Sequence, residues 1–244
     1  MVYKAVIFDY IGTLVNCRNY TMEASRLKLH SALVAEGFDV SQDSFLAAYM
    51  TAHEKYRKVR YEEYREITNA VWVAEALDNL GFKVAVDDYR IKAALNVFFK
   101  DFIDTLELRD DAKKLIHQAQ KQCKLGLISN FTYAPVIYKS LRQLRLNEAF
   151  QAVVVSEEVG WRKPSSQIFQ TALNRLQVNP DEAVFIGDSP IEDIKGAKQA
   201  GLKTIFVPSQ FSTLKDLLDS KVKPDYIAED IETIIQSLLQ ILGS

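Results

Sequence analysis

The chain has 244 residues, a length that fits one domain with a large insertion or two small domains. Hydrophobic residues make up 48% and charged residues 25%, proportions that argue against a fibrous, disordered or membrane-embedded chain. Thirty Lys and Arg residues stand against 32 Asp and Glu residues, and the formal net charge of -2 creates no overall attraction to nucleic acid or anionic membranes.

The chain carries two cysteines, Cys17 and Cys123, which are too few for a disulfide framework and lack the CxxC spacing of a zinc or redox site. The amino-terminal sequence MVYKAVIFDY enters an apolar pattern directly, without the basic stretch and cleavage site of an export signal. No segment reaches the roughly 18 uncharged apolar residues that a membrane span requires. We therefore expect a cytoplasmic protein without a membrane anchor.

Five short runs rich in Val, Ile, Leu and Phe recur along the chain, and a loop and a segment with helical spacing follow each of them. Such runs are typical of parallel strands joined by helical crossovers. The sequence therefore predicts an α/β protein with a doubly wound, Rossmann-like parallel sheet. The predicted strands are Ala5–Phe8, Leu125–Ser129, Ala152–Val155, Ala183–Ile186 and Thr204–Val207.

The long interval between the first two predicted strands contains no further strand run, but it does contain four stretches with helical spacing. Together these stretches can form a small helical bundle. We therefore predict an inserted four-helix subdomain at residues 16–107. The α/β core would consist of residues 1–15 and 108–244.

Ligands of an open parallel sheet bind beyond the carboxyl ends of its strands, so the residues that follow each strand are the candidates for a site. Asp9 follows the first predicted strand, Ser129 and Asn130 lie at the end of the second, and Asp188 follows the fourth. Lys163 lies downstream of the third. We expect these four loops to converge at one edge of the sheet.

The acidic residues of these loops suit nucleophilic and metal-assisted chemistry. A carboxylate such as Asp9 can attack phosphorus or carbon and form a covalent intermediate. Asp9, Asp188 and Asp193 would form a cluster whose charges repel one another unless a cation neutralises them, and Mg²⁺ prefers such oxygen ligands. The alternative role for Asp193 is that of a favourable negative charge near a helix amino terminus.

Polar groups that could hold an anion accompany the acidic residues. Ser129 and Asn130 offer a hydroxyl and an amide suited to hydrogen bonds with phosphoryl oxygens, and their alternative role is to cap a turn. Gly12 and Thr13 would let the chain turn sharply after Asp9 and would present backbone donors and one hydroxyl to the anion.

Four stretches carry these residues in order: VIFDYIGTL, LGLISN, VSEEVGWRKPSSQIF and VFIGDSPIEDIKGAKQAGL. In these motifs the whole chain resembles the haloacid dehalogenase superfamily, whose members include phosphatases, phosphonatases, dehalogenases and phosphomutases. The resemblance implies that the helical insertion is a cap that closes over the catalytic edge and selects the substrate.

For the site, the resemblance implies that Asp9 is the nucleophile and that Lys163 holds both Asp9 and the bound anion. It implies a Mg²⁺ cofactor bound by Asp9, by the backbone carbonyl of Ile11 and by Asp188, with Asp193 reached through water or a neighbour. The implied partner is a small phosphorylated substrate. We expect a monomer or homodimer that binds neither nucleic acid nor a membrane.

Ile11 departs from the pattern of the family's phosphatases. Most of them carry a second Asp two positions after the nucleophile, which protonates the leaving oxygen and later activates water. Isoleucine cannot exchange a proton, and such general acid or base assistance is typically worth about a hundredfold to ten-thousandfold in rate. The backbone carbonyl of Ile11 remains able to bind a metal ion, because that role does not depend on the side chain.

Three functions are compatible with this departure. The first is a Mg²⁺-dependent phosphatase that is slow, limited to substrates whose leaving group needs no proton, or assisted by a residue of the cap. The second is a hydrolase of the phosphonatase or dehalogenase type, which lacks the second acid; a phosphonatase would need a cap lysine, for which Lys55 and Lys58 are candidates by composition. The third is a catalytically weak pseudoenzyme that binds anions. Asp188 and Asp193 favour magnesium and phosphorus chemistry over dehalogenation.

Substrate contacts within the insertion are predicted at Arg18 and Tyr20, because both lie just after the first motif at the entrance to the cap. The stretch YMTAHEKYRKVRYEEYREI also places aromatic and basic residues on one helical face. We expect its aromatic residues to pack within the bundle, and its basic residues to be solvated or paired with Glu54, Glu62 and Glu63.

Overall fold

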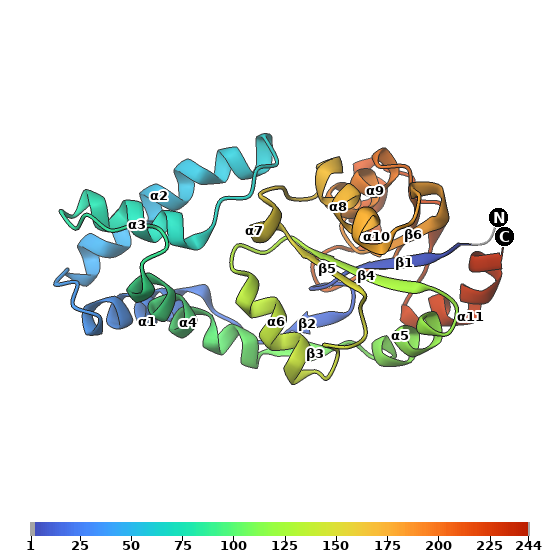
Figure 1. Ribbon diagram of the computed structural model, residues 1–244, viewed down its shortest axis with the longest axis horizontal. Coiled ribbons are helices and arrows are strands. Elements are labelled where there is room, and N and C mark those ends of the chain that lie inside the picture. The colour runs from blue at the N-terminus through green and yellow to red at the C-terminus, as the bar shows by residue number, and fades with distance from the viewer. Residues whose placement is uncertain (1–2, 244) are drawn as a thin grey trace. The chain divides into compact units, whose positions relative to one another are not determined.

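The computed structural model describes residues 3–243 and divides the chain into two compact units. The core unit comprises Met1–Cys17 and Leu106–Ser244, and the helical unit comprises Arg18–Thr105. Figure 1 shows the sheet of the core unit and the helices of both units. Within the described part of the chain, no helix is both long enough and apolar enough to cross a membrane.

The core unit contains a six-stranded sheet in the order β5-β4-β1-β6-β7-β8, and every pairing in it is parallel. This confirms the predicted α/β fold with a parallel sheet. The last strand was not predicted, because two residues with one of them exposed form no apolar run. The strands are β1 (Ala5–Asp9), β4 (Lys124–Ser129), β5 (Ala152–Val155), β6 (Ala183–Gly187), β7 (Lys203–Phe206) and β8 (Tyr226–Ile227).

The strands form where the sequence is apolar throughout, because helices cover both faces of the sheet. Ala5 and Ile7 of β1 pack with Phe169 and other residues of α8 on one face. Side chains alternate along a strand, so Val6 and Phe8 point to the opposite face. In Figure 1, α8 and α9 lie on one side of the sheet, while α5 and α11 lie on the other.

The helices of the core unit follow the strands in the alternating order typical of crossover connections. A π-helical segment, η2, follows β6 directly. The helical segments are α5 (Ala112–Gln120), α6 (Ala134–Gln143), α7 (Ser156–Val159), α8 (Ser166–Leu176), η1 (Pro180–Glu182), η2 (Pro190–Lys195), α9 (Gly196–Gln199), α10 (Leu214–Ser220) and α11 (Ile231–Gly243).

The register of the sheet brings the ends of three strands together. Asp9 at the end of β1 lies beside Ile128 of β4, so Ser129 comes one residue beyond it. Phe8 lies beside Ile186 of β6, which places Gly187 level with Asp9 and Asp188 one step further along. The carboxyl ends of β4, β1 and β6 therefore carry the predicted site residues at one edge.

A two-stranded antiparallel ribbon closes the core unit where the chain leaves for the helical unit and returns from it. It pairs β2 (Val15–Cys17) with β3 (Leu106–Leu108). Sequence analysis found no strand here, because each strand has three residues and only the first of them is buried. The predicted insertion at 16–107 differs from the helical unit by two residues at each end, because the ribbon belongs to the core.

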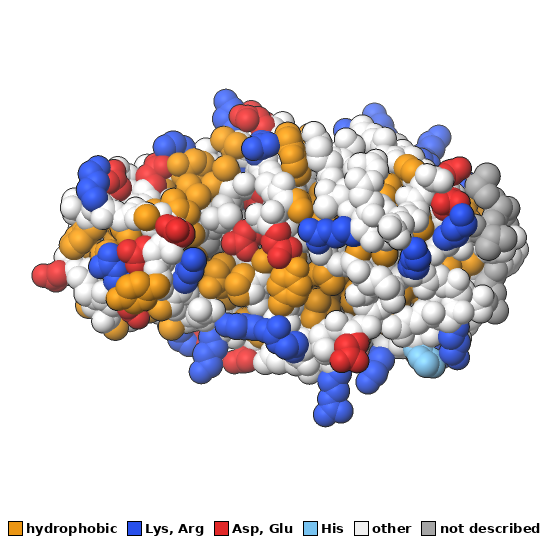
Figure 2. Space-filling model, in the orientation of Figure 1, with side chains coloured by type: hydrophobic (Ala, Val, Ile, Leu, Met, Phe, Trp, Pro, Cys, Tyr) orange, Lys and Arg blue, Asp and Glu red, His pale blue; other side chains and the backbone are white. Residues whose placement is uncertain are grey.

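The helical unit consists of α1 (Met22–Ala35), α2 (Gln42–Glu62), α3 (Asn69–Asn79) and α4 (Tyr89–Asp104). Two of these helices begin with a side-chain cap, which satisfies an otherwise unpaired backbone donor. The Ser41 hydroxyl accepts from the Ser44 N–H, and the Asp88 carboxylate accepts from the Arg90 N–H. On the molecular face shown in Figure 2, acidic and basic side chains are interspersed.

We predict that Phe169→Ala lowers the free energy of unfolding by about 3–5 kcal/mol, because truncating a buried Phe leaves a cavity. Phe169 is fully buried in α8, and its ring packs edge-on against Phe185 of β6 at 5.2 Å between centroids. Denaturant unfolding measures the loss. The matched control is Phe211→Ala at a side chain that is 55% exposed; equal losses in the two variants would contradict the assignment of Phe169 to the core.

Candidate active site

Asp9 lies at the carboxyl end of the central strand β1, where its side chain is buried. Its Oδ1 accepts a hydrogen bond from Lys163 Nζ at 2.6 Å. Its Oδ2 is also buried, and no atom of residues 3–243 is a hydrogen-bond partner for it. A buried carboxylate oxygen without a donor is unfavourable, so this oxygen is suited to contact a ligand.

Lys163 lies in the loop between α7 and α8 and is 1% exposed. Its ammonium group also donates to Asp193 Oδ1 at 2.6 Å and to the Ile128 carbonyl at 3.4 Å. Burial opposes its charge, but the carboxylates of Asp193 and Asp9 outweigh that effect and raise the pKa of Lys163. Lys163 is therefore a permanent cation that links two carboxylates.

Asn130, just beyond β4, holds the backbone of Lys163 from both sides. Its Oδ1 accepts from the Lys163 N–H at 2.8 Å, and its Nδ2 donates to the Lys163 carbonyl at 3.0 Å. Nδ2 also donates to Glu192 Oε2 at 3.0 Å. The amide that was predicted to bind phosphate thus positions the lysine, while Ser129 is buried at the adjacent end of β4.

Asp193 lies in η2 with no exposed surface. Its Oδ2 accepts from the backbone N–H groups of Asp188 at 3.1 Å and Ser189 at 2.8 Å, while its Oδ1 faces Lys163. A Cβ on Gly187 would lie 2.5 Å from Asp193 Cβ, so only glycine fits there. Asp193 therefore fixes the loop that carries Asp188, and its contact with a metal ion stays a prediction.

Asp188 is buried beside Asp9 and receives two hydroxyl donors. Ser209 Oγ donates to its Oδ2 at 2.5 Å, and Thr13 Oγ1 donates to its Oδ1 at 3.3 Å. Burial, together with the negative charge of Asp9, raises the pKa of the Asp188 carboxyl to about 6. The Thr13 hydroxyl thus contacts this carboxylate, and its predicted contact with an anion stays a prediction.

The three carboxylates form a group that suits a small divalent cation. One oxygen from each of Asp9, Asp188 and Asp193 lies within 4.8 Å of the others. Lys163 is the one basic side chain bonded to this group among the described residues, so the cluster keeps an excess of negative charge. The unpartnered Asp9 oxygen and the all-oxygen donor set fit Mg²⁺, which prefers carboxylate and water ligands.

Gly12 forms the sharp turn after β1, with φ at +110°. Its N–H donates to the Val15 carbonyl at 2.8 Å and so closes the turn, and the contact of this segment with an anion stays a prediction. A Cβ at this position would lie 2.5 Å from Asp188 Oδ2. Because Gly12 has no side chain, it leaves room for the Asp188 carboxylate.

Arg109 and Ser209 belong to the site but were not predicted. Arg109 Nη1 donates to the carbonyl of Gly12 at 2.6 Å, and its Nη2 donates to that of Pro208 at 2.8 Å. It thereby ties the turn after β1 to the loop after β7, from which Ser209 reaches Asp188. Ser209 follows a predicted strand run and could have been found by its position, whereas no sequence signal distinguishes Arg109.

Ile11 is half-buried within the turn that follows β1. Tyr10, the nearest titratable residue in the sequence, is fully buried, and its hydroxyl lies 2.9 Å from Ser140 Oγ. Burial raises the pKa of Tyr10, which makes its hydroxyl a poor proton donor at neutral pH. The carbonyls of Tyr10 and Val15 accept the hydrogen bonds that close this turn. The contact of the Ile11 carbonyl with a metal ion stays a prediction.

The predicted substrate contacts Arg18 and Tyr20 lie in the helical unit. The ring of Tyr20 packs edge-on against Phe102 of α4, with 4.9 Å between centroids. The Arg18 N–H donates to the Thr105 carbonyl at 3.1 Å. These contacts fix the segment that leads into α1, and substrate binding by the two side chains stays a prediction.

The two candidate Schiff-base lysines are paired with carboxylates on the helices. Lys55 donates to Glu75 at 2.9 Å, and this hydrogen bond raises the pKa of Lys55. Lys58 lies 3.9 Å from Glu62. A Schiff-base lysine needs a lowered pKa, so neither contact favours phosphonatase chemistry.

The aromatic and basic stripe of α2 takes part in packing and ion pairs, as expected. The His53 ring packs edge-on against Trp72 of α3, with 4.9 Å between centroids. Arg57 pairs with Glu54 at 3.4 Å. Arg60, however, pairs with Glu66 at 2.6 Å, outside the expected set of partners.

Residues 3–201 match the family model of the haloacid dehalogenase-like hydrolases. A ribulose-1,5-bisphosphate 5-phosphatase of Halopiger xanaduensis is 27% identical over 241 residues, which cover 94% of this chain and 95% of that protein. A glyceraldehyde 3-phosphate phosphatase of Methanothermobacter thermautotrophicus is 28% identical over 211 residues, with 86% and 87% covered.

Solved structures share the fold over nearly the full length. A 2-haloacid dehalogenase from Pseudomonas syringae superimposes with a TM-score of 0.68 at 21% identity and covers 98% of this chain and 99% of its own. The HAD-hydrolase YfnB from Bacillus subtilis, bound to magnesium, superimposes with a TM-score of 0.59 at 24% identity and covers both chains completely.

We predict that Gly12→Ala weakens Mg²⁺ binding by about 10- to 100-fold, because the new methyl group displaces Asp188. Isothermal titration with Mg²⁺ measures the affinity. The matched control is Gly37→Ala, since Gly37 also has a positive φ, +94°, but nothing lies within 4 Å of its added Cβ. Both variants bear a backbone cost of about 1 kcal/mol, so equal Mg²⁺ affinities in the two would contradict the role of Asp188.

Proposed function

Because the chain belongs to the haloacid dehalogenase-like hydrolases, we propose that this hydrolase is a Mg²⁺-dependent phosphatase of small phosphate monoesters, acting through an aspartyl-phosphate on Asp9. The observation that carries the proposal is the hydrogen bonding of the two oxygens of the Asp9 carboxylate. Lys163 holds one of its oxygens, and the other is buried without a hydrogen-bond donor among residues 3–243. The names of the two relatives above, both phosphatases, support a phosphorylated substrate.

In the first step, Asp9 attacks phosphorus, a P–O bond to the aspartyl carboxylate forms, and the bond to the leaving alcohol breaks. Lys163 keeps Asp9 oriented for this attack, because it holds Oδ1 at 2.6 Å. The hydroxyl of Ser129 at the end of β4 would bind a phosphoryl oxygen as charge develops on it. Asn130 contributes indirectly, by fixing the backbone of Lys163.

In the second step, water attacks the phosphorus of the acyl phosphate, inorganic phosphate leaves and the Asp9 carboxylate is restored. Asp9, Asp188 and the Ile11 carbonyl would hold Mg²⁺, with Asp193 behind them ordering the Asp188 loop. When bound, Mg²⁺ supplies positive charge that neutralises the carboxylates and the phosphoryl oxygens. Ile11 cannot protonate the leaving oxygen, so substrates with acidic leaving groups are favoured.

The acidic cluster separates this proposal from the other hydrolytic chemistries. Dehalogenation leaves no role for the cation that three buried carboxylates require. The similarity to the dehalogenase structure concerns the fold alone. Phosphonate cleavage needs a reactive lysine, and Lys55 is bound to Glu75. The remaining alternative is an anion-binding pseudoenzyme, which Ile11 favours and which turnover would exclude.

The test is hydrolysis of p-nitrophenyl phosphate, whose leaving group departs without a proton. We expect turnover that requires Mg²⁺, disappears with a chelator and is lost in Asp9→Asn, because the amide is not a nucleophile. Asp219→Asn, at an exposed position on α10, is the matched control and should retain full activity. Mg²⁺ binding without turnover in the wild type would favour the pseudoenzyme.

A second prediction concerns the missing acid. Ile11→Asp should raise the turnover of an alkyl phosphate such as glycerol phosphate by about a hundredfold to ten-thousandfold, because the alkoxide leaving group then receives a proton. p-Nitrophenyl phosphate should gain much less. Steady-state kinetics on both substrates give the ratio; an unchanged ratio would show that leaving-group protonation does not limit the wild-type enzyme.

A further inference from the structure

A pocket lies at the edge of the sheet opposite the candidate active site. We propose that this pocket binds a small organic anion whose apolar part packs against two tyrosine rings. Its lining residues precede or begin strands, whereas the catalytic residues follow them. The pocket has a volume of about 550 Å³, within the range of small-molecule sites. It is lined by Tyr3, Asp181, Lys198, Gly201, Leu202, Lys203, Asp225 and Tyr226.

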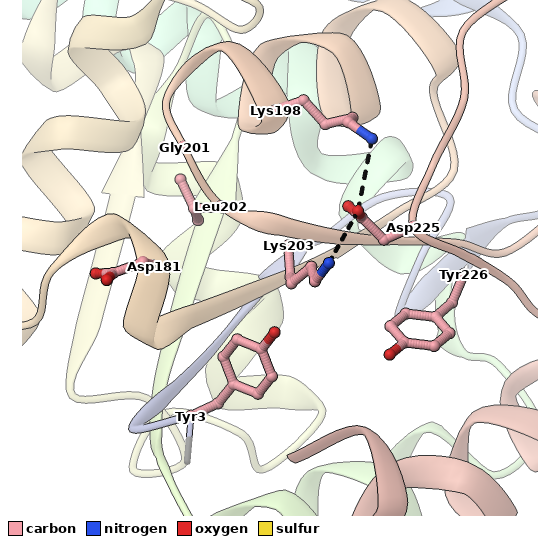
Figure 3. Close-up of a pocket in the computed structure, with 8 residues that line it drawn as sticks. All are labelled: Tyr3, Asp181, Lys198, Gly201, Leu202, Lys203, Asp225 and Tyr226. Carbon is pink, nitrogen blue, oxygen red and sulfur yellow. Dashed lines mark hydrogen bonds and ion pairs between the residues drawn. The ribbon is translucent and has the colours of Figure 1, made fainter. Parts of the chain in front are cut away.

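The amino ends of β1, β7 and β8 build the pocket. Tyr3 precedes β1, Lys203 begins β7 and Tyr226 begins β8. Since these strands are parallel, their first residues share one edge. In Figure 3, the hydroxyls of Tyr3 and Tyr226 point toward the space between the two rings, and the ammonium group of Lys203 points toward Asp225.

Asp225 lies in the polar part of the pocket lining, and both of its carboxylate oxygens already accept hydrogen bonds from the protein. Its Oδ2 accepts from the N–H and the hydroxyl of Thr204 at 3.0 and 2.8 Å. Its Oδ1 accepts from Lys203 at 3.2 Å and lies 3.6 Å from the ammonium group of Lys198. Burial opposes the charge of Asp225, but the hydrogen bonds from Thr204 and Lys203 outweigh it and lower the pKa of this carboxyl.

The groups of this pocket that remain available to a ligand are hydrogen-bond donors. Lys203 has three N–H donors and is 44% exposed along its side chain, so Asp225 does not saturate it. The hydroxyls of Tyr3 and Tyr226 add two donors, and burial raises the pKa of Tyr3, which keeps it protonated. Two ammonium groups share the Asp225 carboxylate, so the side of the pocket that they form keeps an excess of positive charge, while the carboxylate of Asp181, also in the lining, points away from them in Figure 3. A carboxylate or a phosphate is the complementary group.

The apolar part of the ligand follows from the rest of the lining. The rings of Tyr3 and Tyr226 and the side chain of Leu202 supply apolar surface beside the ammonium groups. Gly201, with φ at +89°, turns the chain into β7 without a side chain at the rim. An anion with a compact apolar body therefore gains more from this pocket than a small hydrated anion does.

The test uses ¹⁵N-labelled full-length protein titrated with benzoate, acetate and the uncharged isostere benzamide. We expect benzoate to shift the backbone amide resonances of Lys203 and Tyr226, and to bind more tightly than acetate or benzamide. Lys203→Met should weaken benzoate binding by about tenfold, because one charge-assisted contact is lost. Tyr226→Phe should weaken it several-fold, and Lys113→Met, at an exposed position on α5, should leave it unchanged.

Three outcomes would overturn the proposal. Benzoate that shifts no amide in the pocket, or only those around Ser129 and Gly12, would assign any anion binding to the catalytic edge. Benzamide binding as tightly as benzoate would remove the role of the lysines, and acetate binding as tightly would remove that of the rings. Tyr226→Phe keeps the test decisive if Lys203→Met does not fold, and both readouts are independent of phosphatase turnover.

Discussion

The Lys163 ammonium group, held between Asp9 and Asp193, is the interaction on which the rest of the site depends. Burying an ammonium group costs several kcal/mol unless carboxylates and hydrogen bonds compensate for the lost water. Lys163 has both, with carboxylate oxygens at 2.6 Å on either side. Because Asp193 also accepts hydrogen bonds from the backbone of Asp188 and Ser189, Asp9, Lys163 and the loop that carries Asp188 form one connected unit.

The parallel sheet makes this unit possible, because it places the ends of strands that are distant in sequence side by side. Asp9, Ser129 and Asp188 come together through the pairing of β1 with β4 and β6. The same topology collects the starts of the strands at the other edge, where Tyr3, Lys203 and Tyr226 meet. Two places where polar side chains gather therefore follow from one arrangement of strands: an acidic cluster at the carboxyl edge, and a pocket with two lysines and two tyrosines at the amino edge.

The turn after β1 limits the chemistry more than any other segment. Arg109 and Gly12 give this turn a fixed shape, and that shape leaves room for Asp188. Ile11 occupies the place of the usual proton donor, while the hydroxyl of its neighbour Tyr10 lies against Ser140. Under the proposed function, the site therefore has groups that could attack and hold a phosphoryl group, and Ile11 provides no side-chain acid for the leaving oxygen.

The sequence by itself determined five of the six parallel strands, because strands buried on both faces are rich in apolar residues. It also determined the acidic motifs at the strand ends, since each consists of residues close together in the chain. Only the tertiary structure decided that Asn130 holds Lys163, that Thr13 and Ser209 bind Asp188, and that β2 pairs with β3. These contacts join residues far apart in sequence, 97 positions in the case of Arg109 and Gly12, and no local pattern of hydrophobicity or charge encodes such partners.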